Sequence, residues 1–134
     1  MRSVVVDTSA AVALLTGEPE GAKVAHSLRD DDTVLMSAAS MVELEIVLTA
    51  RFGPIGATLV NRFLRTAEVT VVPVSQDQAD LAVDAYARYG KGLNRPGLNY
   101  GDTFVYALAS SMAAEILALG DEFSMTDLSV LELA

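Results

Sequence analysis

Short β-branched runs alternate with helical patterns along the whole chain, and this alternation constrains the fold more than any other feature. Residues 2–6, 33–36, 69–72 and 116–119 are short apolar runs, which predict buried strands. The segments between them predict helices at 10–15, 19–28, 57–66, 76–89 and 100–114, with a long helix that begins at Ser37 or Ser40 and ends near residue 52. Alternating strands and helices favour an α/β fold with a mainly parallel sheet. Residues 129–133 are a candidate fifth strand.

Length and composition set the scale of the fold. The chain has 134 residues, of which 51% are hydrophobic, so we expect residues 1–134 to form a single domain. The absence of cysteine excludes disulfides, thiolate zinc sites and cysteine nucleophiles. No apolar run approaches the roughly 18 residues of a membrane span, and no signal peptide is recognisable. We therefore expect a cytoplasmic protein without a membrane partner.

The balance of acidic and basic residues limits which functions the chain can have. Eighteen acidic residues against nine basic ones give a formal net charge of −9, which argues against a nucleic-acid binder unless bound cations neutralise a cluster of acids. So acidic a surface also fits a basic protein partner. Because His26 is the single histidine, chemistry that needs a pair of imidazoles is excluded. Carboxylate, hydroxyl, lysine and tyrosine side chains and metal-bound water remain for acid–base work.

Acidic residues recur at the edges of the apolar segments. Asp7 follows the first predicted strand, Glu43 interrupts the long helix, Asp102 begins a later helix, and the pair Asp121–Glu122 follows the last strand. Ligands of open parallel sheets bind beyond the carboxyl ends of the strands, where Asp7 and Asp121 are expected. Most of these acids have apolar neighbours, among which an unpaired charge is costly to bury.

Each acid also has an ordinary structural explanation. Asp7 is a favourable helix N-cap, and Ser40 with Glu43 matches a capping box. Asn99 can cap the helix in which Asp102 would interact with the helix dipole. The pair Asp121–Glu122 fits a surface turn. Taken together, however, the acids predict a site for Mg²⁺ or Mn²⁺, which prefer carboxylate oxygens and support phosphodiester hydrolysis.

Four segments, in this order, carry a family resemblance. The chain resembles PIN domains, and more closely the VapC-type toxin ribonucleases of type II toxin–antitoxin pairs. The matching segments are Val5-Val6-Asp7-Thr8-Ser9-Ala10, residues 37–43, residues 97–109 and residues 120–127. The resemblance implies a three-layer PIN fold with four or five strands and a metal-dependent endoribonuclease that uses Mg²⁺ or Mn²⁺.

The resemblance also implies roles for individual residues. Asp7, Glu43, Asp102 and a fourth acid would form the catalytic site, with Asp7 and Asp102 as direct metal ligands and Ser9 supporting them. The fourth acid is the least defined, because Ala118-Leu119-Gly120 stands where many relatives have Thr-x-Asp. Asp121 is the first choice; the alternatives, in order, are Glu122 and Asp127.

The implied mechanism and partners follow from the family. A metal-activated water would attack the phosphodiester in line and leave 5′-phosphate and 3′-hydroxyl ends, with Glu43 positioning that water. A small VapB-like antitoxin would block the site. Antitoxins of this kind often place an Arg side chain next to the carboxylates. The family also favours homodimers.

One locally basic stretch precedes Asp102. It contains Lys91 and Arg95, which we expect to hold RNA phosphates, and Arg51 on the long helix is a further candidate. The alternative is a solvated surface loop.

Two other functions compete with the nuclease. In phosphatases of the haloacid-dehalogenase type, Asp7 would be the nucleophile, but these enzymes need an Asp two residues later, where this chain has Ser9. The second competitor is a non-catalytic PIN-like module that binds RNA or protein.

Overall fold

A four-stranded parallel sheet forms the centre of the molecule. The computed structural model describes residues 2–92 and 94–133, and its strands are β1 (Ser3–Val6), β2 (Thr33–Ser37), β3 (Thr70–Val72) and β4 (Glu115–Leu117). Their order across the sheet is β3-β2-β1-β4, and every neighbouring pair is parallel. The predicted parallel sheet is therefore confirmed.

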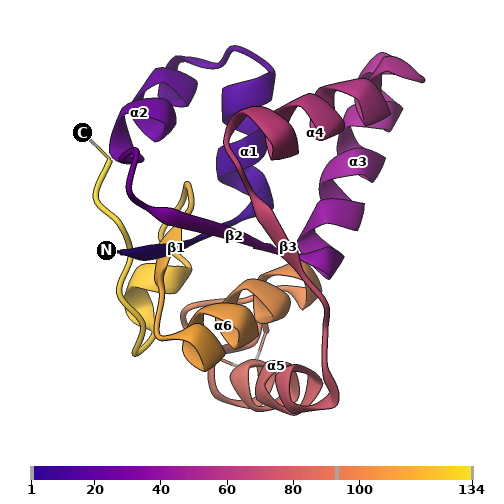
Figure 1. Cartoon of the computed structure of the whole chain (residues 1–134). Coiled ribbons are helices and arrows are strands. Elements are labelled where there is room, and N and C mark those ends of the chain that lie inside the picture. Colours follow the sequence, from indigo (N-terminus) through magenta and orange to yellow (C-terminus); the bar gives the residue numbers. More distant parts are fainter. Residues whose placement is uncertain (1, 93, 134) are drawn as a thin grey trace.

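Helices cover both faces of this sheet. They are α1 (Thr8–Leu15), α2 (Pro19–Ser27), α3 (Ala38–Phe52), α4 (Ile55–Thr66), α5 (Gln76–Tyr89) and α6 (Tyr100–Met112), followed by the short 3₁₀ helix η1 (Phe123–Met125). Figure 1 shows α1 to α4 on one face and α5 with α6 on the other, which confirms the three-layer α/β/α fold. None of the helices in the described part of the chain is both long and apolar enough to span a bilayer.

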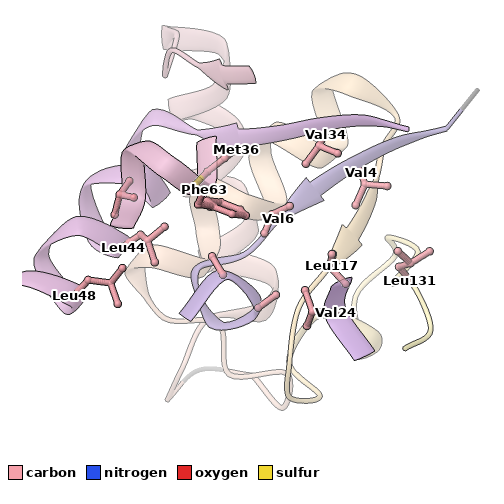
Figure 2. Close-up of a cluster of buried hydrophobic side chains, with 13 residues drawn as sticks. Val4, Val6, Val24, Val34, Met36, Leu44, Leu48, Phe63, Leu117 and Leu131 are labelled. Atoms are coloured by element: carbon pink, nitrogen blue, oxygen red, sulfur yellow. The ribbon is translucent and has the colours of Figure 1, made fainter. Parts of the chain in front are cut away.

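The alternating side chains of the strands create two cores. Val4 and Val6 of β1 point into the cluster shown in Figure 2, which also contains Met36 and Leu44 and lies beneath α1, α3 and α4. Val5 belongs to the opposite cluster, with α5 and α6. Successive strand residues face opposite sides of a sheet, so a strand buried on both faces must be apolar at every position. This requirement explains the uninterrupted run Val4-Val5-Val6.

The candidate fifth strand does not form. Val130 makes only an isolated parallel bridge with Ile116, through hydrogen bonds from Ile116 N to Ser129 O (2.9 Å) and from Leu131 N to Ile116 O (2.8 Å). The C-terminal segment therefore lies beside β4 at the edge of the sheet, but it does not add a fifth strand. The expectation of a strand over 129–133 was wrong, although the apolar residue Leu131 is buried in the first core.

The strand ends determine where the acidic residues gather. β1 leads directly into α1, β2 leads directly into α3, and β4 leads into the turn before η1. Because the strands are parallel, these three exits lie at the same edge of the sheet. The segments that carry Asp7, Glu43 and residues 120–122 therefore leave the sheet side by side.

Candidate active site

Asp7 is fixed at the junction of β1 and α1. It is the N-cap of α1, only 6% exposed, and its Oδ2 accepts hydrogen bonds from Ser9 N (3.1 Å) and from the Ser9 hydroxyl (2.5 Å). The capping role anticipated for Asp7 is therefore confirmed. Capping by itself does not explain why a carboxylate occupies so buried a position, since Ser or Asn would cap equally well.

Ser9 connects this carboxylate to the exit of β4. Its Oγ accepts a hydrogen bond from Leu119 N (3.0 Å) while its hydroxyl donates to Asp7. The backbone of Asp7 is fixed as well, because its N–H donates to Leu117 O (2.9 Å). The orientation of the Asp7 side chain is thus coupled to the turn that leads to Asp121 and Glu122.

Asp102 lies in the first turn of α6 and forms a reciprocal capping box with Asn99. Asn99 N donates to Asp102 Oδ2 (3.0 Å), and Asp102 N donates to Asn99 Oδ1 (2.9 Å). The carboxylate is half-buried. The predicted cap is confirmed, and it holds the Asp102 side chain in a defined position at the start of the helix.

Glu43 reaches the same region from α3. The alternative explanation of Glu43, a capping box with Ser40, does not hold. Ser37 caps α3 by accepting from Ala39 N (3.2 Å), and Ala38 already begins the helix. Glu43 instead lies in the second turn, and its carboxylate rests against Gly101. A Cβ atom at Gly101 would lie 2.6 Å from Glu43 Oε2, so the glycine gives the α3 carboxylate room beside α6.

The pKa shifts show that these carboxylates share one electrostatic environment. Burial raises the pKa of Asp7, its hydrogen bonds from Ser9 oppose that rise, and the charge of Glu43 adds to it. Burial also raises the pKa of Asp102, to about 6; the Asn99 N–H opposes the rise, and the charges of Asp7, Glu122 and Glu43 increase it. Asp102 therefore lies within electrostatic range of three other acids that come from three different segments.

The fourth acid is distinguished by its effect on Asp102. Glu122 is half-buried and its charge is one of the main causes that raise the pKa of Asp102, whereas Asp121 is exposed. The carboxylate of Glu122 folds back over Gly120, where a Cβ would meet its Oε2 at 2.6 Å. Gly120 has a φ of +89°, a backbone conformation in which glycine avoids strain.

Asp127 belongs to a separate network. Its Oδ1 accepts from the hydroxyls of Tyr106 (2.6 Å) and Tyr89 (3.4 Å), and its Oδ2 lies 3.7 Å from Arg88 Nη2. The hydrogen bond from Tyr106 is the main reason that the pKa of Asp127 is lowered. These contacts explain Asp127 as a residue that fastens the C-terminal segment to α5 and α6.

The donor set fits a hard cation. Like charges repel within a partly desolvated pocket, and carboxylate oxygens are the ligands that Mg²⁺ and Mn²⁺ prefer. Within residues 2–92 and 94–133, no three Asp, Glu or His side chains are close enough to form a preformed ligand set. The carboxylates are thus near one another without meeting at a single point.

The predicted basic residues occupy two different places. Lys91 and Arg95 are both exposed on the loop before α6, of which Leu93 lies outside the described residues. That loop is held by hydrogen bonds from the Tyr86 hydroxyl to Lys91 O (3.1 Å) and from Lys91 N to Leu98 O (2.7 Å). Arg51 lies two turns beyond Glu43 on α3, about 12 Å along the helix, and its Nη1 is 3.9 Å from Glu18 Oε1.

Sequence reasoning missed the role of Gly101. Glycine is a poor residue inside a helix, so its presence in the first turn of α6, next to Asp102, was the available signal. The contact with Glu43 provides the reason for it.

Comparisons with known proteins agree with this architecture. The PIN domain family model matches residues 4–128. A protein named Ribonuclease VapC from Mycolicibacterium smegmatis is 46% identical over 125 residues, which cover 93% of this chain and 97% of that protein.

Solved structures share the same fold at low sequence identity. The VapC20 toxin of Mycobacterium tuberculosis, described as cleaving the sarcin–ricin loop, superposes with a TM-score of 0.78 at 19% identity and covers 98% of this chain and 99% of its own. A toxin–antitoxin complex from Klebsiella pneumoniae gives a TM-score of 0.70 at 15% identity and 92% coverage of both chains. Because the PIN domain model matches residues 4–128 of its 134 residues, this chain belongs to the PIN domain family.

Proposed function

We propose that this protein is a metal-dependent endoribonuclease that hydrolyses RNA phosphodiester bonds as the toxin of a toxin–antitoxin pair. The observation that carries the proposal is the electrostatic coupling of Asp102 to Asp7, Glu43 and Glu122, which come from separate segments of the fold. The 46% identity to a protein named Ribonuclease VapC, along nearly the whole chain, supports the same activity.

In this proposal Asp7 and Asp102 hold a Mg²⁺ or Mn²⁺ ion. Ser9 holds the Asp7 carboxylate and Asn99 holds the Asp102 carboxylate, so both side chains would be fixed in place to bind the cation. When bound, such an ion supplies a hydroxide nucleophile at neutral pH and neutralises charge on the phosphate. Ser9 and Asn99 keep the two carboxylates in position before the ion arrives, which reduces the cost of organising the site.

Glu43 and a fourth acid complete the site. Glu43 approaches from α3 across Gly101, and we assign to it the orientation of the attacking water. We assign the fourth position to Glu122, because its charge acts on Asp102. Asp121, the first choice from the sequence, is the exposed alternative, and replacing each of the two separately distinguishes them.

RNA phosphates are assigned to the basic loop. Lys91 and Arg95 are exposed, and the loop leads directly to Asn99 and Asp102. Arg51 is a weaker candidate because its guanidinium already lies near Glu18. Replacing Lys91 and Arg95 by Ala should weaken RNA binding and flatten its dependence on salt; unchanged binding would exclude this role.

An antitoxin is the proposed protein partner. The similar fold in a toxin–antitoxin complex from Klebsiella pneumoniae supports a small VapB-like protein that covers the site. A cationic side chain from that partner would relieve the repulsion among the carboxylates. A homodimer of the toxin chain remains part of this proposal, and sedimentation of the purified protein tests it.

Cleavage of a mixed RNA pool tests the proposed activity. The wild-type protein should cut RNA with Mg²⁺ or Mn²⁺ and should stop when EDTA is added. Asp102→Asn should be inactive, whereas Asp121→Asn, an equivalent change at an exposed neighbouring carboxylate, should retain activity. Cleavage that persists in Asp102→Asn would contradict the assignment. RNA binding without cleavage by the wild-type protein would favour the non-catalytic binding module.

A further inference from the structure

An apolar groove runs between α5 and α6 and includes Asn99, the N-cap of α6. It is open to solvent and has a volume of about 690 Å³, which is typical of small-ligand pockets. Val83 and Tyr86 of α5 line one side, Tyr100 and Phe104 of α6 line the other, and Lys91 contributes a cation at its edge. Within the described residues, no carboxylate forms an ion pair with Lys91.

Tyr100 is the most unusual residue of this groove. It is 78% exposed, more than any other large apolar or aromatic side chain in the described part of the chain. Its ring meets that of Phe104 edge to face, with centroids 5.0 Å apart and planes at 81°. This contact orients the Tyr100 ring while most of the residue stays open to solvent. An aromatic ring that is both exposed and oriented can stack on another planar group.

The groove and the acidic site have Asn99 in common. Tyr100 precedes Asp102 by two positions in the first turn of α6, and Asn99, which also lines the groove, is the residue that holds the Asp102 carboxylate. Oδ1 of Asn99 accepts from Asp102 N, so its Nδ2 group is the donor left for a ligand. Residues two apart in a helix do not face each other, so a molecule stacked on Tyr100 would lie on the groove side of α6, and Asn99 would separate it from the Asp102 carboxylate.

The net negative charge of the chain favours a ligand that is bound by stacking rather than by long-range attraction. The chain carries a net charge of −9, so an RNA strand gains little from long-range attraction outside the basic loop. Stacking of a base on an aromatic ring does not depend on net charge, and single-stranded RNA is commonly recognised in this way. Lys91 also lines the groove, and we assign its ammonium group to the phosphate of the stacked nucleotide.

We propose that this groove binds one nucleobase of the single-stranded RNA substrate, with the base stacked on Tyr100 and its phosphate on Lys91, and that Asn99 separates this base from the acidic site. Tyr100 then positions the strand and contributes to the choice of cleavage site. This inference rests on the proposed ribonuclease function. It adds a residue that is not acidic and that acts on binding rather than on hydrolysis.

Binding of a short single-stranded RNA that contains 2-aminopurine tests the proposal. Fluorescence anisotropy, with Ca²⁺ as the cation and a gel to check that the RNA stays intact, gives the Kd. Tyr100→Ala should raise the Kd about tenfold and lose the quenching of 2-aminopurine that stacking produces. Tyr100→Phe should keep both properties, because the ring remains. Met112→Ala, at an exposed apolar residue on the opposite end of α6, should bind as the wild type does.

Three results would overturn the proposal. If the wild-type protein cleaves RNA while Tyr100→Ala matches it in Kd, quenching and cleavage pattern, the groove holds no base and the nuclease function stands. If the wild-type protein neither binds nor cleaves RNA, both proposals fail together. If Tyr100→Ala instead separates a dimer in light scattering and leaves RNA affinity unchanged, the groove is an interface between protein chains.

Discussion

Replacing Asp102 by Asn should stabilise the metal-free protein while it abolishes activity. Burial and the charges of Asp7, Glu122 and Glu43 raise the pKa of Asp102 from 3.8 to about 6. At about 1.36 kcal/mol per pKa unit, this rise corresponds to roughly 3 kcal/mol of destabilisation when the carboxylate is charged. Partial exposure screens the interaction, so we expect a gain of about 1–2 kcal/mol for Asp102→Asn at neutral pH.

The pH dependence follows from the direction of the shift. The folded protein binds the Asp102 proton more tightly than the unfolded chain does, so the wild-type protein loses stability as pH rises through about 6. The advantage of Asp102→Asn should therefore be largest above pH 7, as set by the folded pKa of about 6. The stability difference between Asp102→Asn and the wild type should disappear near pH 4, which is close to the unfolded pKa of 3.8. Burial also raises the pKa of Asp7, so Asp7→Asn should change stability in the same direction.

Thermal unfolding in EDTA between pH 4 and pH 8 measures this effect. A gain of about 1–2 kcal/mol raises the Tm by roughly 4–8 °C in a domain of this size. Asp121→Asn is the matched control and should leave the Tm unchanged, because Asp121 is exposed. A lower Tm for Asp102→Asn, or a difference that does not vary with pH, would refute the idea that the acids repel one another in the metal-free site.

Three further predictions concern residues that support the site or the core. Ser9→Ala should lower metal affinity or cleavage about 10- to 100-fold, because it removes the hydroxyl between Asp7 and Leu119; wild-type kinetics would exclude this role. Gly101→Ala should reduce cleavage by at least about tenfold with little loss of Tm, since its Cβ would lie 2.6 Å from Glu43 Oε2. Leu44→Ala should cost about 2–5 kcal/mol in urea unfolding, because Leu44 is fully buried in the core of Figure 2; a loss below about 1 kcal/mol would contradict that packing.

The sequence predicted the fold well where local signals agree with tertiary packing. α5 spans Gln76–Tyr89 as expected: Ser75 caps its start through Gln78 N, and Gly90 follows its last residue. β1 and α1 were also located, because a β-branched run is followed directly by the capping residue Asp7. Periodicity and caps determine such elements within a few residues.

Details that depend on contacts distant in sequence were not predictable. Ser37 and Ser40 are both plausible caps for α3, and the choice is made by β2, which continues through Ser37 and leaves Ala38 to begin the helix. The choice of Glu122 over Asp121 as the fourth acid depends on the turn at Gly120, which brings the Glu122 carboxylate back over the glycine. Residues 129–133 have the composition of a strand, but only Val130 pairs with β4.

The candidate site, like the fold, was predictable from the sequence only in part. Asp7 and Asp102 could be singled out because capping positions and apolar neighbours are visible in the sequence. Their ordinary capping roles proved to be real, so capping and metal binding are not alternatives here. The groove beside Tyr100 could not be anticipated, because it is formed by two helices whose packing the sequence does not specify.

Calorimetric titration with Mn²⁺ tests the central claim most directly, because it measures the acidic site without depending on the choice of RNA. The wild-type protein should bind Mn²⁺ and release protons at pH 6, since the bound ion favours the charged form of Asp102. Asp102→Asn should bind at least about tenfold more weakly, and Asp121→Asn should bind like the wild type. Equal Mn²⁺ affinity in Asp102→Asn and the wild type, or no binding by the wild type, would contradict a metal site built on Asp7 and Asp102.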